Sequence, residues 1–283
     1  MITVFTPTYN RAYIIGKLFE SLKAQTVKNF EWLVINDGGS DDTSELFKRF
    51  MSEDNGFPII YREVENGGKH RAINKAVQMA GGEGFFTVDS DDWLLPDAME
   101  KAEKWFDMIA DKEGYAAVSG FKGYSENDPI GGFGTFEGEF VDATYLERDK
   151  YNLMLDKAEI YKTEILKKYP FPEFEGEKFI TEAVVWNSIG KDGYKIRWFN
   201  EVISIGEYLE DGLTKNANCR ILASPLGYSY HLDILESIYG AGEVDVHRLK
   251  FYQALMSEYG QDEAFRIINM INLRKGRKKP AFD

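Results

Sequence analysis

The sequence predicts an α/β fold in which a mostly parallel sheet is flanked by helices and followed by a helical C-terminal extension. Three observations support this prediction. Short apolar segments typical of buried strands alternate with segments whose apolar residues recur at helical spacing. A polar, turn-rich loop follows each of the first apolar segments. From residue 221 to residue 271 the pattern is helical throughout.

The first half of the chain repeats a strand, a polar loop and a helix. Residues 2–5 are apolar, residues 6–11 interrupt them with a proline and polar groups, and helical spacing then begins at Ile14. The same reasoning predicts strands at 2–5, 32–35, 59–61 and 85–88, and helices near 14–22, 46–51, 72–80 and 98–109. Strands joined in this way pair in parallel through right-handed crossovers.

The second half is less regular. We expect two strands, at 116–121 and 196–205, and two helices, at 158–169 and from Thr181 onward. The glycine-rich segment 123–138 is either a mobile flap over a site or an ordinary surface hairpin. The helix before Pro170 should end there, because the residue before a proline disfavours the helical conformation. We divide the chain into a domain of residues 1–215 and a helical extension of residues 216–283.

Composition excludes several classes of protein. The net charge is −13, from 34 Lys and Arg against 47 Asp and Glu, which argues against a nucleic-acid partner. The single cysteine excludes an intramolecular disulfide and a thiolate metal cluster. No apolar run approaches the roughly 20 residues that span a bilayer, so we expect a cytoplasmic protein. The basic run 274–279 is either solvated or a peripheral contact with the anionic inner leaflet of the membrane.

Carboxylates follow the fourth predicted strand directly. The apolar run 85–88 leads into Asp89, Ser90, Asp91 and Asp92. Carboxylates held close together repel each other and favour a hard cation such as Mg²⁺ or Mn²⁺, which usually also binds substrate phosphates. Aspartate suits a turn or a helix N-cap equally well, so this segment alone leaves both interpretations open.

The other polar loops bear on that choice. In parallel sheets, ligands bind beyond the carboxyl ends of the strands. The segments expected to converge at this edge are 6–10, Asp37, Lys69 and 89–92. Their convergence favours a metal and phosphate site over a helix cap.

Three motifs stand in the order and spacing of the GT-A fold glycosyltransferases, and specifically resemble the large bacterial family two. They are Thr6-Pro7-Thr8-Tyr9-Asn10-Arg11, the segment 35–43 around Asp37, and Val88-Asp89-Ser90-Asp91-Asp92. Segments 68–74 and 170–179 resemble a closer subgroup. The resemblance covers most of the first 215 residues and implies a Rossmann-like, mostly parallel sheet.

The resemblance implies roles for individual residues on the donor side. Residues 6–9 would contact the base and ribose of the nucleotide, and Asp37 would accept the uracil N3 proton, with a turn cap beside Gly38 as the alternative. Lys69 would place a cation near the diphosphate, with a solvated helix residue as the alternative. The residues implied to bind the nucleotide sugar are Thr6, Pro7, Thr8, Tyr9, Asp37, Lys69, Asp89 and Ser90.

For the metal, Asp91 resembles the direct ligand of a divalent cation, Mn²⁺ or Mg²⁺, and Asp89 the partner on the ribose side. A cation that bridges Asp91 and the two phosphates would offset the charge of the leaving nucleoside diphosphate. Asp92 is expected to cap the following helix, because Trp93, Leu94 and Pro96 resemble a first turn.

The catalytic base should come from the second half of the chain. In inverting relatives an acidic pair starts a helix, and its second member deprotonates the acceptor hydroxyl; the matching positions here are Thr181 and Glu182. Glu182 is therefore the implied base, and Glu177 is a rival, although a glutamate at a helix start is often only a dipole partner. His231 either approaches the metal, as a histidine does in some relatives, or is a packed residue.

The resemblance implies an inverting glycosyltransferase that moves a sugar from a UDP-sugar, or another nucleoside diphosphate sugar, to a hydroxyl acceptor. The acceptor would be a sugar or lipid-linked intermediate of bacterial surface polysaccharide or glycolipid synthesis. A nucleotidyltransferase is the alternative enzyme, although residues 6–11 lack the glycine- and arginine-rich loop normal for that class. A non-catalytic nucleotide-sugar binding protein is the alternative outside enzymes.

Overall fold

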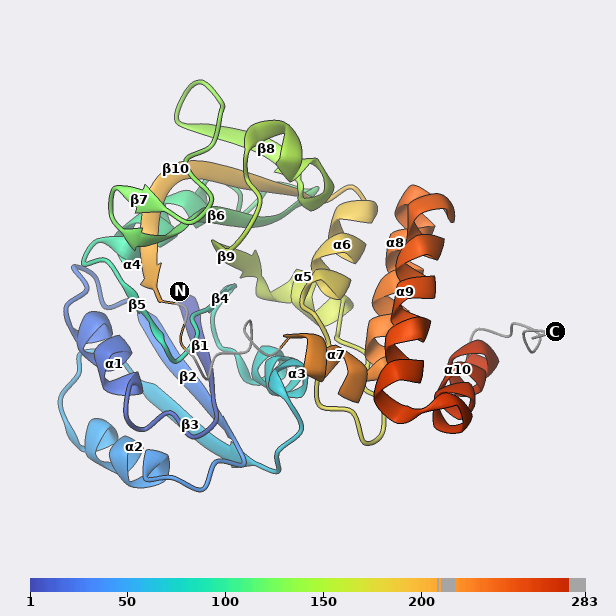
Figure 1. The fold of residues 1–283 in the computed structure, drawn as a ribbon. Helices are drawn as coiled ribbons and strands as arrows, with labels where there is room; N and C mark the ends of the chain where they lie inside the picture. The colour runs from blue at the N-terminus through green and yellow to red at the C-terminus, as the bar shows by residue number, and fades with distance from the viewer. Residues whose placement is uncertain (208, 210–216, 275–283) are drawn as a thin grey trace.

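The structure is a computed structural model that describes residues 1–207, 209 and 217–274. In its first half, parallel strands alternate with helices (Figure 1). The strands are β1 (Ile2–Thr8), β2 (Phe30–Asp37), β3 (Ile59–Val64) and β4 (Gly84–Thr87). The helices are α1 (Ile15–Lys23), α2 (Thr43–Ser52), α3 (Lys69–Met79) and α4 (Ala98–Asp107). The predicted order of these elements is confirmed.

Strands β1 and β2 are longer than predicted. Thr6 and Thr8 continue β1 and pair in parallel register with Val34 and Asn36, and Asp37 is the last residue of β2. The polar side chains therefore begin inside the sheet rather than in the loops beyond it. The reason is that the neighbouring strand satisfies the backbone groups of this segment, which overrides the turn preference of its residues.

The prediction that Asp92 caps a helix is wrong. Asp92–Leu94 form a short strand, β5, which pairs antiparallel with residues 204–206, and α4 begins only at Ala98. The apolar side chains of this segment are buried by strand pairing instead of by a helical first turn.

The glycine-rich segment begins as a hairpin. Strand β6 (Tyr115–Ser125) turns into the short β7 (Asp128–Pro129), which pairs back on it. Farther along, the backbone N–H of Gly134 donates to Asn200 Oδ1 at 2.9 Å. The segment then enters β8 (Phe140–Thr144) and the 3₁₀ helix η1 (Tyr145–Tyr151). The hairpin interpretation therefore fits its first part.

The predicted helix at 158–169 is half wrong. Its first part is a strand, β9 (Lys157–Lys162), and only Thr163–Lys168 form a helix, α5, which ends before Pro170 as predicted. Strand β9 pairs antiparallel with both β4 and β6. The residues of β9 could form a helix or a strand. They form a strand because the neighbouring strands β4 and β6 supply hydrogen-bond partners for their backbone groups.

The remaining elements agree with the predictions. Helix α6 spans Ala183–Lys191 and strand β10 spans Lys195–Gly206. The C-terminal helices are α7 (Ala217–Ala223), α8 (Pro225–Tyr239), α9 (Gly242–Tyr259) and α10 (Gln261–Arg274). The domain boundary at residue 215 and the basic residues 275–279 lie outside the described residues. Among the described helices, we find none with the length and apolar character needed to cross a membrane.

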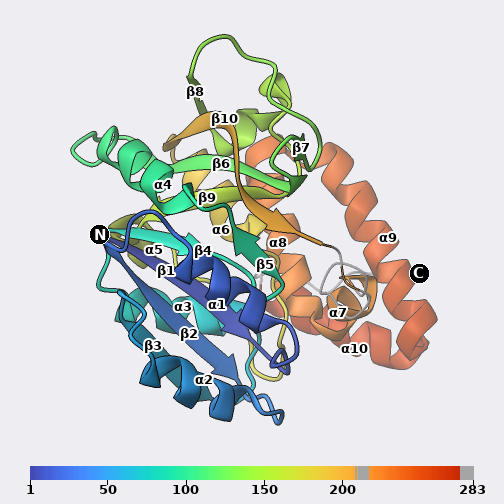
Figure 2. The same cartoon turned by 90° about the vertical axis from the view of Figure 1, so that its left-hand side faces the viewer.

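The sheet has two covered faces. Its strand order is β3-β2-β1-β4-β9-β6-β10-β5, with β7 beside β6 and β8 beside β10. One apolar core joins the sheet to α1, α2 and α4, and a second joins it to α3, α5 and α6. Both views place α8, α9 and α10 together at one side of the sheet (Figures 1 and 2). Helices α3 and α6 both begin near the edge at which β4 ends, because Lys69, the first residue of α3, contacts both Asp89 and Glu182.

Candidate active site

The ammonium of Lys69 lies between two carboxylates. Lys69 opens α3, and its Nζ is 2.7 Å from Asp89 Oδ1, 2.9 Å from Asp89 Oδ2 and 2.7 Å from Glu182 Oε1. The three side chains are each between a fifth and two fifths exposed, so solvent reaches the cluster. Residues from three separate parts of the chain thus meet at one point, as the sequence predicted for Lys69 and Asp89.

The segment 170–179, which leads to Glu182, is fastened along α3. Gly68 has φ +93°, and a Cβ at this position would lie 1.9 Å from the carbonyl oxygen of Lys178. Arg71 donates to the carbonyl oxygens of Glu177 at 2.5 Å and of Phe174 at 2.6 Å. Because these contacts involve backbone groups, they fix the path of the segment and not only its side chains.

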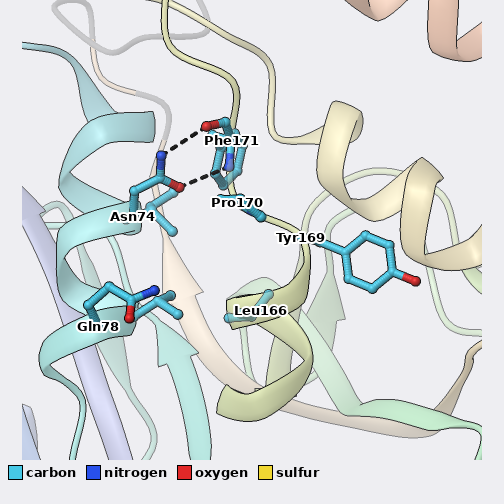
Figure 3. A pocket seen from close by; sticks show the side chains of 8 residues that line it. Asn74, Gln78, Leu166, Tyr169, Pro170 and Phe171 are labelled. Atoms are coloured by element: carbon cyan, nitrogen blue, oxygen red, sulfur yellow. Dashed lines mark hydrogen bonds between the residues drawn. The ribbon is translucent and has the colours of Figure 1, made fainter.

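Asn74 completes this attachment one turn farther along α3. Its side-chain amide donates to the carbonyl oxygen of Phe171 and accepts from the Phe171 N–H, both at 2.9 Å (Figure 3). A cavity of about 120 Å³ lies beside this contact, lined by residues of α3, α5 and the Tyr169–Phe171 segment. None of the predicted site residues lines it. The cavity is therefore a space between α3, α5 and the segment held by Asn74, and it is separate from the candidate active site.

Electrostatics stabilise the charged forms of Lys69 and Asp89. Burial alone would lower the pKa of Lys69, but Asp89 and Glu182 outweigh it and raise the pKa above its usual range. Burial likewise acts to raise the pKa of Asp89, whereas Lys69 and Lys122 lower it further than burial raises it. The site therefore holds an ammonium and an ionised carboxylate at neutral pH.

Asp91 differs from Asp89 in having no ion-pair partner among the described residues. Burial raises its pKa, and the charge of Asp89 raises it further. A cation placed here would offset both effects. No three Asp, Glu, His or Cys side chains gather as a complete metal cage in the described part of the chain. One or two carboxylates are what Mg²⁺ or Mn²⁺ takes from a protein when substrate phosphates complete its coordination, so these residues fit such an ion.

Asp92 is paired with a lysine that the sequence reasoning missed. Lys122, on β6, places its Nζ 2.7 Å from Asp92 Oδ1, and both side chains are largely buried. A Cβ on Gly206 would lie 2.2 Å from the same oxygen, so the pair depends on this glycine. A lone lysine in a strand carries little signal in a sequence. Only β10, which pairs with β6 on one side and with β5 on the other, brings Lys122 to Asp92.

The predicted nucleotide loop is mostly internal. The Thr6 side chain is fully buried and its hydroxyl accepts a hydrogen bond from Trp32 Nε1 at 3.0 Å. Thr8 and Ser90 are also buried, and Pro7 is half-buried. Tyr9 is 51% exposed, which leaves its ring available to a ligand. The roles predicted for these residues in nucleotide binding remain predictions.

Asp37 holds the loop that precedes α3. Its carboxylate accepts hydrogen bonds from the backbone N–H of Gly67 at 2.8 Å and of Gly68 at 2.7 Å. Asn66 donates to the Asp37 carbonyl oxygen as well. The Asp37 side chain therefore holds the turn that precedes Lys69. This role is larger than the turn cap beside Gly38 that the sequence suggested as an alternative. Its predicted contact with uracil remains untested.

Glu177 has a structural role. Its two carboxylate oxygens accept the backbone N–H of Leu226 at 2.7 Å and of Gly227 at 2.8 Å, at the start of α8. Burial raises the pKa of Glu177, although these two hydrogen bonds act in the opposite direction. A carboxylate whose two oxygens both accept hydrogen bonds from the N-terminus of a helix is poorly placed to take a proton from a substrate. Glu182, at the N-cap position of α6, is the better candidate for the base.

The described histidines do not join the carboxylates. His231 faces the ring of Tyr228 on its own helix, and burial lowers its pKa to about 4. His70 is 2% exposed, and burial lowers its pKa to about 4 as well. Both values describe neutral, packed imidazoles, which favours the packed alternative for His231.

Sequence relatives identify the family. The family described as "Glycosyl transferase family 2" matches residues 3–167. Glycosyltransferase GlyA of Streptococcus pneumoniae is 29% identical over 212 residues, or 75% of this chain and 27% of that protein. The GalNAc(5)-diNAcBac-PP-undecaprenol beta-1,3-glucosyltransferase of Campylobacter jejuni is 26% identical over 278 residues, 93% of this chain and 82% of that one. The chain thus spans about a quarter of the first relative and most of the second.

Solved structures share the fold. TarS 1–349 of S. aureus in complex with UDP-GlcNAc matches with a TM-score of 0.61 and 18% identity over 99% of this chain and 93% of that one. The mannosyltransferase PcManGT from Pyrobaculum calidifontis, in complex with GDP-Man and Mn²⁺, matches with a TM-score of 0.58 and 18% identity over 98% and 81%. These likenesses confirm the predicted GT-A fold. With the family match extending over more than half of its length, this chain belongs to glycosyl transferase family 2.

Proposed function

We propose that the protein is an inverting glycosyltransferase that moves a sugar from a UDP-sugar, or another nucleoside diphosphate sugar, to a hydroxyl acceptor. The observation that carries the proposal is the position of Lys69 Nζ, 2.7 Å from both Asp89 and Glu182. It joins the carboxylate expected on the donor side to the carboxylate expected to act as base. The Campylobacter jejuni glucosyltransferase and the TarS complex with UDP-GlcNAc support the same activity.

The reaction would be a single in-line displacement. Glu182 takes the proton from the acceptor hydroxyl as its oxygen forms a bond to the anomeric carbon of the sugar. The bond from that carbon to the diphosphate oxygen breaks, and the oxygen leaves with the electron pair. Lys69, held by Asp89, stabilises the negative charge of the departing diphosphate. Attack opposite the leaving group inverts the anomeric configuration.

A divalent cation, Mn²⁺ or Mg²⁺, would be held by Asp91, with Asp89 beside it. When bound, it would act as a Lewis acid that neutralises charge on the two phosphates. The complex of PcManGT with GDP-Man and Mn²⁺ supports this assignment. A nucleotidyltransferase would use a similar carboxylate site but would release pyrophosphate from a nucleoside triphosphate, so the product distinguishes the two reactions.

The acceptor would be a sugar or a lipid-linked saccharide of a bacterial surface polysaccharide or glycolipid. The Campylobacter jejuni relative, which is named for an undecaprenol-linked acceptor, supports this class. We propose a cytoplasmic protein with a peripheral contact at the inner leaflet, made by the basic residues after Arg274. Arg274 itself is engaged within the protein, because its Nη2 lies 2.5 Å from Asp233 Oδ2.

The test combines nucleotide binding with product analysis. UDP and GDP are titrated with and without Mn²⁺, and binding is measured by the rise in melting temperature. Asp91→Asn should abolish the part of the shift that depends on Mn²⁺, and Glu182→Gln should preserve it. Transfer or hydrolysis of a UDP-sugar should fall about a hundredfold or more in Glu182→Gln. A wild-type protein that binds neither nucleotide, or a Glu182→Gln variant that turns over at the normal rate, contradicts the proposal.

A further inference from the structure

The segment that leads to the expected base touches the C-terminal helices as well as α3. Residues 170–182, called the base segment below, run from the end of α5 to Glu182 at the N-cap of α6. The contacts with α3 described above hold one side of the base segment. Its other side contacts α8 and α10, and α8 itself lies beside α6 (Figure 1). The helical extension therefore reaches the part of the chain that carries the base.

The N-terminus of α8 is bonded to the base segment in both directions. The Glu177 carboxylate accepts the backbone N–H groups of Leu226 and Gly227. In return, the backbone N–H of Phe179 donates to Oγ of Ser224, the N-cap residue of α8, at 3.2 Å. Ser224 is only 2% exposed, so water cannot easily replace this contact. The base segment cannot move along the end of α8 without breaking one of these hydrogen bonds.

Gly227 lets the base segment pack directly on the backbone of α8. A Cβ at this position would lie 2.8 Å from Ile180 Cγ1 and 2.9 Å from the carbonyl oxygen of Phe179. Gly227 is not one of the glycines with a positive φ, and alanine suits a helix better than glycine does. The close approach is therefore the physical reason for a glycine here. The two residues that it contacts come just before Glu182 in the chain.

Arg274, at the end of α10, holds the earlier part of the base segment. Its guanidinium carbon lies 5.6 Å from the centre of the Phe174 ring and 5.2 Å from that of Tyr230, on α8. An ion pair with Asp233, also on α8, keeps the guanidinium in place. The backbone of Phe174 is bonded from the other side, where its carbonyl oxygen accepts from Arg71 of α3. Phe174 is thus fixed between the first domain and the extension.

We propose that the helical extension positions the base, with Gly227 and Arg274 as positioning residues that act on Glu182 through the base segment. The proposal rests on the glycosyl transfer proposed above, in which Glu182 takes the acceptor proton. Fixing the base segment keeps Glu182 at its place beside Lys69, 2.7 Å from the ammonium. The donor-side carboxylates belong to or follow β2 and β4, which make none of these contacts with the extension. Disturbing the contacts should therefore slow turnover and leave nucleotide binding intact.

The first test is Gly227→Ala in the full chain. The substitution keeps the backbone N–H that Glu177 accepts, but its methyl group must displace Phe179 and Ile180. UDP- and GDP-sugars are supplied with Mn²⁺, and release of the nucleoside diphosphate is measured. We expect kcat to fall about tenfold or more, because displacing a catalytic group by up to 1 Å has effects of this size or larger. The KM for the nucleotide sugar and the affinity for the nucleoside diphosphate should stay unchanged.

Gly242→Ala is the matched control. Gly242 is the first residue of α9, it has no positive φ, and nothing lies within 4 Å of its Cβ position. This variant should keep the kcat, the KM and the nucleotide affinity of the wild type.

Arg274→Met tests the second contact independently and remains informative if Gly227→Ala does not fold. It removes the planar charge from the Phe174 ring, so kcat should fall about threefold, the typical effect of losing one cation–π contact. Nucleotide affinity should again be unchanged. Arg266→Met, on the same helix, is the control, because that side chain is 78% exposed and pairs with Glu263 one turn away.

The outcomes separate the two proposals. If both variants bind nucleotide and turn over like the wild type, the positioning role is wrong while glycosyl transfer stands. The positioning role is also wrong if nucleotide affinity falls together with kcat, since the loss is then a general loss of structure. A wild-type protein that releases no nucleoside diphosphate from any nucleotide sugar overturns both proposals together.

Discussion

Lys69 Nζ lies 2.7 Å from Glu182 Oε1, which links the first turn of α3 to the first turn of α6. The contact depends on the segment between them being held along α3 by Gly68, Arg71 and Asn74. The same lysine contacts Asp89 at the end of β4. The Lys69 ammonium therefore sets the distance between Asp89, on the expected donor side, and Glu182, on the expected acceptor side.

Replacing Lys69 by methionine should damage function more than stability. Without the lysine, Asp89 and Glu182 would face each other with no cation between them, and diphosphate binding would weaken. UDP-sugar turnover should fall about a hundredfold, which is the typical effect of losing one electrostatic contact to the leaving group. The cluster is partly open to solvent, so the loss of unfolding free energy should be only about 1–2 kcal/mol. Urea unfolding and turnover measure the two effects. Lys75→Met, on an exposed position of the same helix, should change neither.

Glu177→Gln should lower stability. Glutamine keeps one acceptor for the α8 N-terminus, but its amide nitrogen would face the second backbone N–H, so about 1–2 kcal/mol should be lost. Thermal and urea unfolding report the loss, and Glu175→Gln, at an exposed neighbouring position, is the control. A Glu177→Gln protein with normal stability and no transfer activity would instead make Glu177 the base.

The first half of the fold was predictable because its patterns are local. Strands β1, β2 and β4 contain short apolar runs, and β1, β2 and β3 are each followed by a helix with a clear apolar side, so periodicity is sufficient. The parallel arrangement then places the ends of β2 and β4 at one edge. For this reason the meeting of Lys69 with Asp89 followed from the order of elements alone.

The second half depended on contacts that a sequence does not display. Residues of β9 alternate weakly and become a strand because β4 and β6 lie on either side of them. Lys122 reaches Asp92 only because β10 lies between β6 and β5. Glu177 finds its partners in a helix about fifty residues later in the chain. Glu159 and Tyr161 likewise looked helical in the sequence, so their shared face was hidden.

The pH dependence of stability should reveal Glu159. Its pKa is raised from 4.5 to about 7 in the folded protein, so the folded chain keeps this proton at pH values at which the unfolded chain releases it. Glu159 therefore lowers the free energy of unfolding progressively as the pH rises from 4.5 to 7, and the whole of this loss remains above pH 7. Glu159→Gln should gain roughly 2 kcal/mol relative to the wild type between pH 5 and pH 8.

Urea unfolding at several pH values measures this gain. The charges that face Glu159 are those of Arg148, Lys157, Asp156 and Glu182, and the variant leaves them in place. Glu201→Gln, which removes an exposed partner of Lys101, should show no such rise with pH. A gain for Glu159→Gln that is the same at pH 5 and pH 8 would mean that Glu159 titrates normally in the folded protein.

Gly68→Ala should uncouple the two halves of the active site. The new methyl group would lie 1.9 Å from the carbonyl oxygen of Lys178, and the residue has φ +93°, so either the turn before Lys69 or the segment before Glu182 must move. Gly193→Ala is the matched control, because Gly193 also has a positive φ, +84°, but nothing lies within 4 Å of its Cβ position.

Both variants should lose about 1–3 kcal/mol to backbone strain, measured by urea unfolding. Only Gly68→Ala should also lose turnover, by about a hundredfold, since a shift of about 1 Å in a catalytic group has that effect. Nucleotide affinity separates the two directions of movement. If the turn before Lys69 shifts, UDP binding weakens, whereas a shift of the segment before Glu182 lowers turnover with UDP binding intact. Equal turnover in the two variants would show that the separation of Lys69 and Glu182 is set elsewhere in the fold.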